Sequence, residues 1–500
     1  MIIVEQAPGY NTLPAGSIIP FVIFEDTGTL TFEGAKVICN IYVSDFENMS
    51  NILYTGTFKA SPNASGRVIF DFGNIIENVV KPTYSGMNSS NPSAISTIQG
   101  NFYNDMGNYH PIHNIDRYAY SDNSILYVSF DFQVEYIGGG VWDGSAPANQ
   151  MGVAPFYAGS SNLLVFNGVL NDQDVLTYPT TTLPSYGYDL YDYIIKKDGD
   201  FRVGGFITDA PKVQYATINC YGTMAFFNDL EQSTNSFQVA DAGTEDTIAY
   251  ITVQPRTSED VAIGSPITIE NEQINGGYSK NGNDIPNYIG SKTKMIFAGL
   301  YPANLRGWSG DFQNAVTNID TNDFTYYSID CHANNNDVIG EQYKVYIIKE
   351  CLYPPVRIAW LNKWGAWDYY TFMKKSTRQL KTKRKTYTKL KGTWNSNTFN
   401  VNAQAGGSKN YLITTDETIK VNTDYITEEE AQWLEQLFNS NEMYIINPYF
   451  TFSQGNVVNK FSTPVNLTDS SYKKKTKIND KLIQYSFTFK TANNRKSQRP

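Results

Sequence analysis

Residues that could carry chemistry are few and scattered in this chain of 500 residues. Two of the three histidines stand in the stretch His110-Pro111-Ile112-His113, and Asp116 follows closely, so two imidazoles and a carboxylate could hold one metal ion. Pro111 opposes the helix that would present both rings on one face. We therefore expect a polar loop with two ordinary histidines, and no metal site.

Other catalytic signatures are missing from the sequence. It has no Gly-x-Ser-x-Gly elbow, no His-Glu-x-x-His and no phosphate-binding loop that ends in Lys-Ser or Lys-Thr. Three glycines at 138–140 follow a strand pattern, but residues 141–144 begin no helix, so a turn is favoured over a phosphate cradle. The acidic and aromatic tract at 188–193 could line a sugar groove, although carboxylates are too common for the sequence to assign glycosidic chemistry. We predict no enzyme activity, no catalytic residue and no cofactor.

A basic run is the most informative feature of the sequence. Residues 369–391 contain no Asp or Glu, and the run comprises Lys374, Lys375, Arg378, Lys381, Lys383, Arg384, Lys385, Lys389 and Lys391. Such a run could neutralise phosphates while Tyr387 and Trp394 stack on bases. No nucleic-acid motif frames it. We favour a solvated strand or an arm that docks on the acidic part of another copy, with DNA contact as the minority alternative.

Charge is distributed unevenly along the chain, which carries a net charge of -10. Residues 371–500 hold 21 Lys and Arg against 10 Asp and Glu, a net charge of +11. The first 370 residues hold 18 against 39, a net charge of -21. This asymmetry suggests complementary contact between copies or with another partner.

The pattern that must position these residues has mostly a period of two. Apolar and polar side chains alternate over residues 126–136 and again over 483–490, as in half-buried strands. Strand-forming residues also dominate 18–24, 37–43, 67–72, 213–221, 247–253 and 343–348, with Gly, Asn, Asp and Pro clusters between them. We predict an all-β fold, mainly antiparallel β-sandwich domains with long loops and one or two short helices.

Two helices are indicated. Thr427 followed by Glu430 forms a capping-box pattern ahead of an apolar stripe, which predicts a helix over residues 428–438. A second short helix is expected after Gly73, with Asn74 capping residues 75–80.

The chain is expected to divide into three parts. Composition changes near a Pro-Pro pair at 354–355, which separates a basic C-terminal β domain, 351–500, from the acidic region before it. That region is expected to hold an N-terminal β-sandwich, 1–210, and a second β region, 211–350. Residues 81–123 form a polar excursion that we expect to be mobile in an isolated subunit and ordered in an assembly.

Cysteine usage and hydropathy constrain the compartment. The cysteines occur singly, which favours buried free thiols and synthesis in a reducing cytoplasm; they are Cys39, Cys220, Cys331 and Cys351. No run approaches the roughly 20 apolar residues of a membrane helix, and the first eight residues lack a signal-peptide pattern. We expect a protein that neither spans a membrane nor is secreted.

The stretch at 354–372 reads P-P-V-R-I-A-W-L-N-K-W-G-A-W-D-Y-Y-T-F. It resembles the R-I-x-W-L-N-K-x-G-x-W-D-Y-Y-T-F signature of ring, hub or adaptor-type virion tail proteins of Bacteroidetes phages, including crAss-like podoviruses. The order of later segments is similar too, and residues 66–76 resemble the first β-sandwich of that family. The resemblance covers both ends of the chain and is weak over 81–300.

The residues of this signature have a physical interpretation of their own. Gly365 permits a turn between two aromatic strand faces, and Arg357 and Lys363 stand where a carboxylate could meet them. The tryptophans supply bulk for a core, which is the expected case, or for an interface; they are Trp360, Trp364 and Trp367. Together with the cations from Lys374 to Lys385, these tryptophans are the candidate assembly contacts.

The resemblance implies a non-enzymatic structural subunit of a phage tail, assembled as a ring, hub or adaptor around the tail channel. Its partners would be copies of itself and other tail proteins such as portal, adaptor, hub or fibre subunits, with no membrane partner. The expected location is the virion tail, after synthesis in the bacterial cytoplasm. A receptor-binding or glycan-binding adhesin is the alternative, and a glycan depolymerase comes third.

Overall fold

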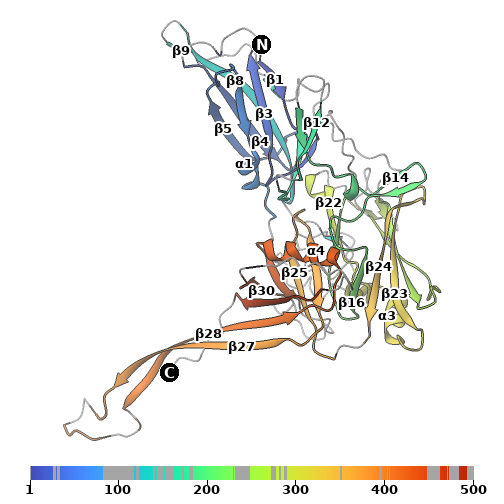
Figure 1. Ribbon diagram of the computed structural model, residues 1–500, viewed down its shortest axis with the longest axis vertical. Coiled ribbons are helices and arrows are strands. Elements are labelled where there is room, and N and C mark those ends of the chain that lie inside the picture. Colours follow the sequence, from blue (N-terminus) through green and yellow to red (C-terminus); the bar gives the residue numbers. More distant parts are fainter. Residues whose placement is uncertain are drawn as a thin grey trace. The chain divides into compact units, whose positions relative to one another are not determined.

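The structure is a computed structural model (Figure 1). It describes residues 2–25, 30, 34–82, 118–119, 123–138, 141–143, 151–152, 162–171, 174–179, 184–228, 230, 248–271, 278–280, 283–285, 290–349, 352–393, 397–401, 404, 406–446, 462–469, 471 and 483–492. The chain forms two compact units, and each is described by itself. The first comprises Met1–Lys349, Leu361–Asp368 and Pro448–Val457, and the second comprises Glu350–Trp360, Tyr369–Asn447 and Val458–Pro500.

The N-terminal part of the first unit is built from two sheets. A three-stranded sheet has the order β1 (Ile2–Gln6), β3 (Pro20–Glu25), β6 (Val68–Asp71). A seven-stranded sheet follows the path β2 (Thr12–Pro14), β11 (Leu163–Phe166), β8 (Ile125–Gly138), β4 (Lys36–Ser44), β5 (Ile52–Ala60), with β9 (Val141–Asp143) and β10 (Met151–Gly152) also paired to β8.

An aromatic core joins these two sheets. The ring of Phe21 on β3 lies 4.6 Å from that of Phe130 and 5.6 Å from that of Phe132, both on β8. Along β8 these side chains are buried, while the intervening Asp131 and Gln133 are partly exposed. The expected period of two is therefore confirmed over residues 129–134, where it explains the packing of this strand against β3, while Tyr127 and Glu135 on the other face are buried as well.

The rest of the first unit centres on a five-stranded sheet. Its order is β16 (Val213–Thr217), β24 (Val338–Ile348), β23 (Phe324–His332), β18 (Tyr250–Thr257), β19 (Ile267–Glu270). A three-stranded sheet contains β17 (Met224–Phe227), β22 (Met295–Ala298) and β7 (Tyr118–Ala119). Three strand pairs complete the unit: β12 (Leu176–Pro179) with β13 (Pro184–Gly187), β14 (Lys196–Asp198) with β15 (Phe201–Val203), and β20 (Tyr278–Lys280) with β21 (Asn283–Ile285).

The second unit is organised around one seven-stranded sheet. Its order is β26 (Trp367–Phe372), β25 (Val356–Leu361), β29 (Met443–Ile446), β30 (Ser462–Leu467), β31 (Ser486–Thr491), β28 (Gly407–Asn422), β27 (Thr377–Lys389). Helix α4 (Glu428–Asn439) packs in this unit, with the ring of Trp433 lying 5.1 Å from that of Trp360. Phe372 lies 5.8 Å from Phe487, so the core consists largely of aromatic side chains.

The all-β fold class is confirmed, and so is the capped helix. In α4 the Thr427 hydroxyl accepts from the Glu430 N–H and the Glu430 carboxylate accepts from the Thr427 N–H. The described residues hold three further α-helices, α1 (Gly73–Glu77), α2 (Pro302–Trp308) and α3 (Gly310–Thr317), and the 3-10 turns η7 (Tyr191–Tyr193) and η8 (Ser291–Lys294).

The expected cap of α1 is wrong. Asn74 lies inside the helix, and the Asp71 carboxylate accepts from the Gly73 N–H at 3.1 Å instead. Helices α2 and α3 were not predicted, because Pro302 and Gly310 interrupt the segment and each helix is too short for a clear apolar stripe.

Several expectations concern segments that the structure covers only in part. The second unit begins at Glu350, beside the division expected at 351, while the division near 210 stays a prediction. Of the excursion at 81–123, only residues 81–82, 118–119 and 123 are among those described. No helix among the described residues is long and apolar enough to cross a membrane.

Candidate functional site

Most of the basic run lies on a projecting β-hairpin of the second unit. Strands β27 and β28 are paired over thirteen positions, from Thr377 opposite Lys420 to Lys389 opposite Gly407. Strand β31 pairs with β28 only at residues 418–422. Beyond these positions the hairpin continues as a two-stranded ribbon, which extends away from the sheet of its own unit (Figure 1). We call residues 380–415 the arm.

The local sequence explains the ribbon. Thr, Tyr and Ile favour extended backbone, and the hydroxyls of Thr382 and Thr415 are 3.2 Å apart across the strands. A bulge interrupts the register where Lys385 pairs with Leu412 and Thr386 pairs with Asn410, which leaves Tyr411 unmatched. From Leu380 to Lys389 the ribbon spans roughly 30 Å.

The arm carries strong positive charge. It contains no Asp or Glu and seven cations, Lys381, Lys383, Arg384, Lys385, Lys389, Lys391 and Lys409. All are exposed, and none of the six on the β27 side forms an ion pair within the described part of the chain. Lys381, Lys383 and Lys385 alternate along β27 and therefore share one face, which we call the lysine face.

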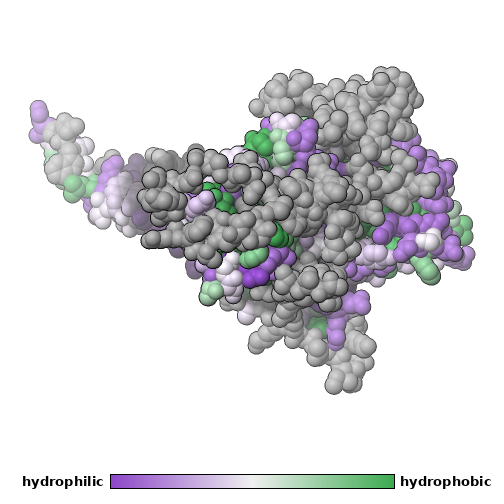
Figure 2. Space-filling view, turned by 90° about the horizontal axis from the view of Figure 1, so that it is seen from above, coloured by the Kyte–Doolittle hydropathy of each residue, from purple (hydrophilic) through white to green (hydrophobic). Residues whose placement is uncertain are grey.

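Large apolar side chains are exposed on the same arm. Seven large apolar residues of the arm have between 43% and 73% of their surface exposed; they are Leu380, Tyr387, Leu390, Phe399, Val401, Tyr411 and Leu412. Leu412 lies opposite Lys385 and so belongs to the lysine face, while Leu380 belongs to the other face. Hydrophobic and hydrophilic residues lie side by side on the projecting hairpin, at the left of Figure 2. Both faces thus combine cations with uncovered apolar surface.

The base of the hairpin behaves differently, because two of its cations, Lys374 and Arg378, have acidic partners. Lys374 Nζ lies 3.1 Å from an Asp424 carboxylate oxygen, and Arg378 is 3.9 Å from Glu417. The backbone oxygen of Lys375 accepts from Asn422 Nδ2 at 2.9 Å. Among the candidate contacts, Lys374 and Arg378 therefore tie the base of the hairpin together, Lys375 contributes through its backbone oxygen, and Lys381, Lys383, Arg384 and Lys385 remain available on the surface of the arm.

The three candidate tryptophans are interior residues. The exposed fraction of the residue surface is 0% for Trp360, 6% for Trp364 and 3% for Trp367. A partner could reach them only if the fold opened, so the core interpretation of these residues holds for the folded chain. Trp360 and Trp367 lie on the strands β25 and β26, and Trp364 lies in the turn between them, with all three in the core, as expected from the sequence.

The turn between β25 and β26 belongs to the first unit and explains the most distinctive part of the signature. The Asn362 side-chain oxygen accepts from the N–H groups of Trp364 and Ala366, and Gly365 adopts a φ of +79°. A Cβ at Gly365 would stand 1.9 Å from the Asn167 carbonyl oxygen. The turn expected at Gly365 is confirmed, and only glycine fits it.

Asp209 is the carboxylate that meets this turn. It accepts from Tyr193 Oη at 2.6 Å and from Trp364 Nε1 at 2.8 Å, and Lys363 Nζ lies 2.9 Å away. Burial, with the nearby Asp209 charge adding to it, raises the pKa of Tyr193. The partner expected for Lys363 therefore lies in the same chain. Arg357 donates to the Thr371 hydroxyl at 2.9 Å and its guanidinium lies over the ring of Tyr369.

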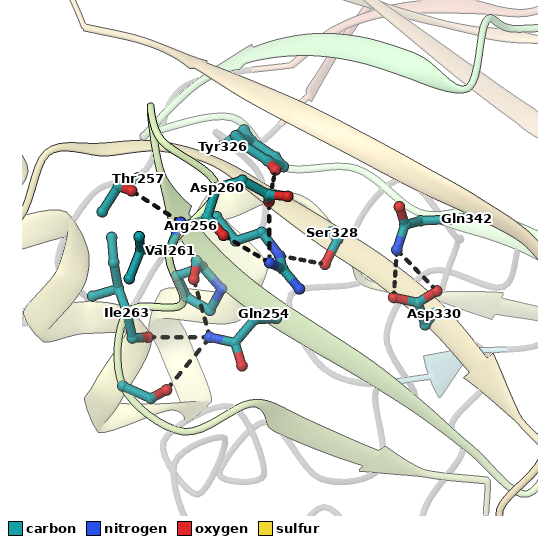
Figure 3. A network of polar contacts seen from close by, with 12 residues as sticks. Gln254, Arg256, Thr257, Asp260, Val261, Ile263, Tyr326, Ser328, Asp330 and Gln342 are labelled. Carbon is teal, nitrogen blue, oxygen red and sulfur yellow. Dashed lines mark hydrogen bonds and ion pairs between the residues drawn. The ribbon is translucent and has the colours of Figure 1, made fainter.

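A second group of polar side chains lies on the five-stranded sheet and the turn that follows β18 (Figure 3). Arg256 Nη1 donates to both the backbone oxygen and the carboxylate of Asp260 at 3.0 Å, and Tyr326 donates to the same carboxylate. Gln342 donates to Asp330 at 2.9 Å. Arg256 and Tyr326 thus hold the turn after β18 against the sheet, while Gln342 and Asp330 form a separate bond between β24 and β23, and all four residues act as structural contacts.

The electrostatics of this network follow from its hydrogen bonds. The bond from Tyr326 is the main cause that holds the pKa of Asp260 below its ordinary value. Burial, and then the bond to Asp260, raises the pKa of Tyr326 to about 12. Both shifts favour a neutral tyrosine donating to a charged carboxylate.

The remaining chemical candidates can be placed as far as the structure describes them. His110 and His113 lie outside the described residues, and no group of three or more His, Cys, Asp and Glu within those residues could hold a metal ion. In the tract at 188–193, Tyr191 donates to Asp198 at 2.9 Å, and Tyr188 is buried. Cys39, Cys220 and Cys331 are buried free thiols as expected, and Cys351 is not described.

Comparisons with known proteins provide little further information. No protein-family model and no curated protein matches the sequence. A solved structure of native alpha-2-macroglobulin from E. coli matches with 9% sequence identity and a TM-score of 0.16. The match covers 84% of this chain and 21% of that one, so the chain spans about a fifth of its length. Similarity at this level carries no argument about function.

Proposed function

We propose that this chain is a non-enzymatic structural subunit of a bacteriophage tail, located in the virion as part of a ring, hub or adaptor. The arm is the observation that carries the proposal. A segment that exposes cations and large apolar side chains on both faces gains little from folding alone, whereas a partner that covers it would remove that apolar surface from water.

The signature at 354–372 supports the same proposal from the sequence side. Its residues shape a tightly locked turn and an aromatic core, which are features of a rigid scaffold. A rigid scaffold that presents one projecting ribbon suits a subunit that repeats the same contact around a ring.

Mass spectrometry of purified tail complexes tests the proposal. The chain should be present at a copy number that is a multiple of the tail symmetry. Its absence from complete particles would refute the structural role. Binding of the isolated chain to whole host cells would instead support the adhesin, and shortening of purified host capsule by the chain would support the depolymerase.

A further inference from the structure

We propose that the arm binds the acidic first unit of a second copy of this chain, so that copies associate head to tail. This inference rests on the proposed function and names the partner of the arm. It follows from the apolar content of the arm, from the charge of the rest of the chain and from the geometry of contacts between identical subunits.

The apolar side chains favour protein over nucleic acid as the partner. A surface that binds phosphates through counterion release needs cations but no apolar surface. The arm exposes Leu380, Leu390, Phe399, Val401 and Leu412 among its cations. Transfer of these side chains out of water gains free energy only against another apolar surface, and a protein interface combines such a surface with a charged rim.

Charge complementarity favours a second copy. The arm carries +7, and removing it from the net charge of -10 leaves -17 on the remaining residues. The first 370 residues, with 39 acidic and 18 basic residues, carry -21, and the residues after 370 that lie outside the arm carry +4. Two arms repel each other and two acidic regions repel each other, so the attractive contact between copies joins an arm to an acidic region.

Such a contact has a definite symmetry. Each copy offers one donor site, the arm, and one acceptor site, and the contact is heterologous when the arm of each copy binds a different neighbour instead of being exchanged within a pair. Heterologous contacts close into rings or continue as filaments. A two-fold dimer held by contacts between arms is therefore not expected.

Mixing experiments with the full-length chain test this arrangement. The variant K381E/K383E/K385E reverses the charge of the lysine face and leaves the acidic acceptor surface unchanged. Alone, this variant should associate roughly tenfold more weakly than wild type or not at all, because three attractive charge contacts at the edge of the interface become repulsive. Mixed with isotope-labelled wild type, it should join complexes as the terminal copy, which native mass spectrometry would detect.

The matched control is K473E/K474E/K475E, which makes the same change in charge at three lysines outside the arm and should associate like wild type. Zero-length carbodiimide coupling provides a second measurement on the wild-type chain. It should link Lys381, Lys383 or Lys385 to Asp or Glu of residues 1–349 in a differently labelled copy.

Three results would overturn the inference: unchanged association of the arm variant, a wild-type chain that stays monomeric at its highest soluble concentration, or arm cross-links that fall only within one copy. Tight binding of free duplex DNA through the arm, lost in K381E/K383E/K385E, would assign the arm to DNA. If tail complexes contain the chain but mixing fails, the proposed function stands without this contact. If the mixing experiment succeeds but tail complexes lack the chain, the head-to-tail contact between copies is supported and the proposed role in the tail is refuted.

Discussion

At the scale of single residues, the structure shows which side chains of the signature are fixed by geometry. Asn362 and Gly365 define the turn between β25 and β26, and Asp209 receives three donors from its surroundings. Their arrangement is explained by the need to satisfy buried backbone and side-chain polar groups.

Replacing Gly365 by alanine should destabilise the chain by roughly 2 kcal/mol or more, because the new Cβ meets a backbone oxygen and the residue has a positive φ. Gly264→Ala is the matched control, since Gly264 has a φ of +67° and open space around a Cβ. The free energy of unfolding of Gly264→Ala should fall by about 1 kcal/mol, which is the penalty of the backbone conformation alone. Urea unfolding measures both variants, and equal losses would contradict the steric argument.

Burial of Tyr326, together with its bond to Asp260, should make the stability of the chain depend on pH in the alkaline range. Because the pKa of Tyr326 is raised to about 12 in the folded chain, its contribution is fully present below the ordinary tyrosine pKa of about 10. It is lost as the pH rises from about 10 to about 12. Wild type should therefore lose more stability over this range than Tyr326→Phe, as measured by urea midpoints. Parallel losses in both proteins would show that other groups dominate.

At the scale of elements, patterned segments were predicted well and irregular ones were not. Strand β8 and helix α4 carry a strong period and a capping box, which local physics converts directly into structure. At the start of helix α1 the Asp71 carboxylate accepts from the Gly73 N–H, and it also accepts from the N–H of Ile19, which is distant in sequence. That partnership depends on tertiary contact, so sequence periodicity could not reveal it.

The candidate site shows the same division. The basic run and the opposite net charges of residues 1–370 and 371–500 were visible in the sequence. The return strand β28, the exposed apolar side chains and the partners of Lys374 and Arg378 at the base required the pairing register. Burial of the signature tryptophans also depends on neighbours distant in sequence, such as Trp433 beside Trp360.

The capping box of α4 should contribute measurably to stability. Thr427→Ala removes the hydroxyl that accepts from the Glu430 N–H and should lower the free energy of unfolding by about 1 kcal/mol. Thr427→Ser keeps an acceptor oxygen, so its free energy of unfolding should fall by only a few tenths of the loss in Thr427→Ala. If the serine and alanine variants unfold alike, the hydroxyl is not the stabilising group.

Leu380 on the arm should be nearly neutral for folding. About half of its surface, 52%, is exposed, so Leu380→Ser should change the free energy of unfolding by less than about 0.5 kcal/mol. Phe489 in the same sheet is fully buried, and Phe489→Ala should lose roughly 3 to 5 kcal/mol. A large loss for the leucine variant would mean that the arm packs against its own chain.

At the scale of the whole molecule, uneven charge is the property from which the proposed assembly derives. Association through the arm should weaken as salt rises from 0.1 M to 1 M, because the Debye length falls from about 10 Å to about 3 Å. The variant K381R/K383R/K385R keeps the charge and should respond to salt as wild type does. Sedimentation at the two salt concentrations measures this, and association that strengthens with salt would indicate a purely apolar contact.

The position of β27 at one end of the seven-stranded sheet has a consequence for solubility. Its outer backbone groups resemble an open template on which another extended chain could add, and lysines along such a border keep identical molecules from joining through it. Neutral substitution of Lys381, Lys383, Arg384 and Lys385 by serine should therefore promote aggregation with β-sheet character. Glutamate at the same four sites would keep like charges along β27 in every molecule and should not promote aggregation. The cations of β27 therefore also protect the protein from uncontrolled polymerisation.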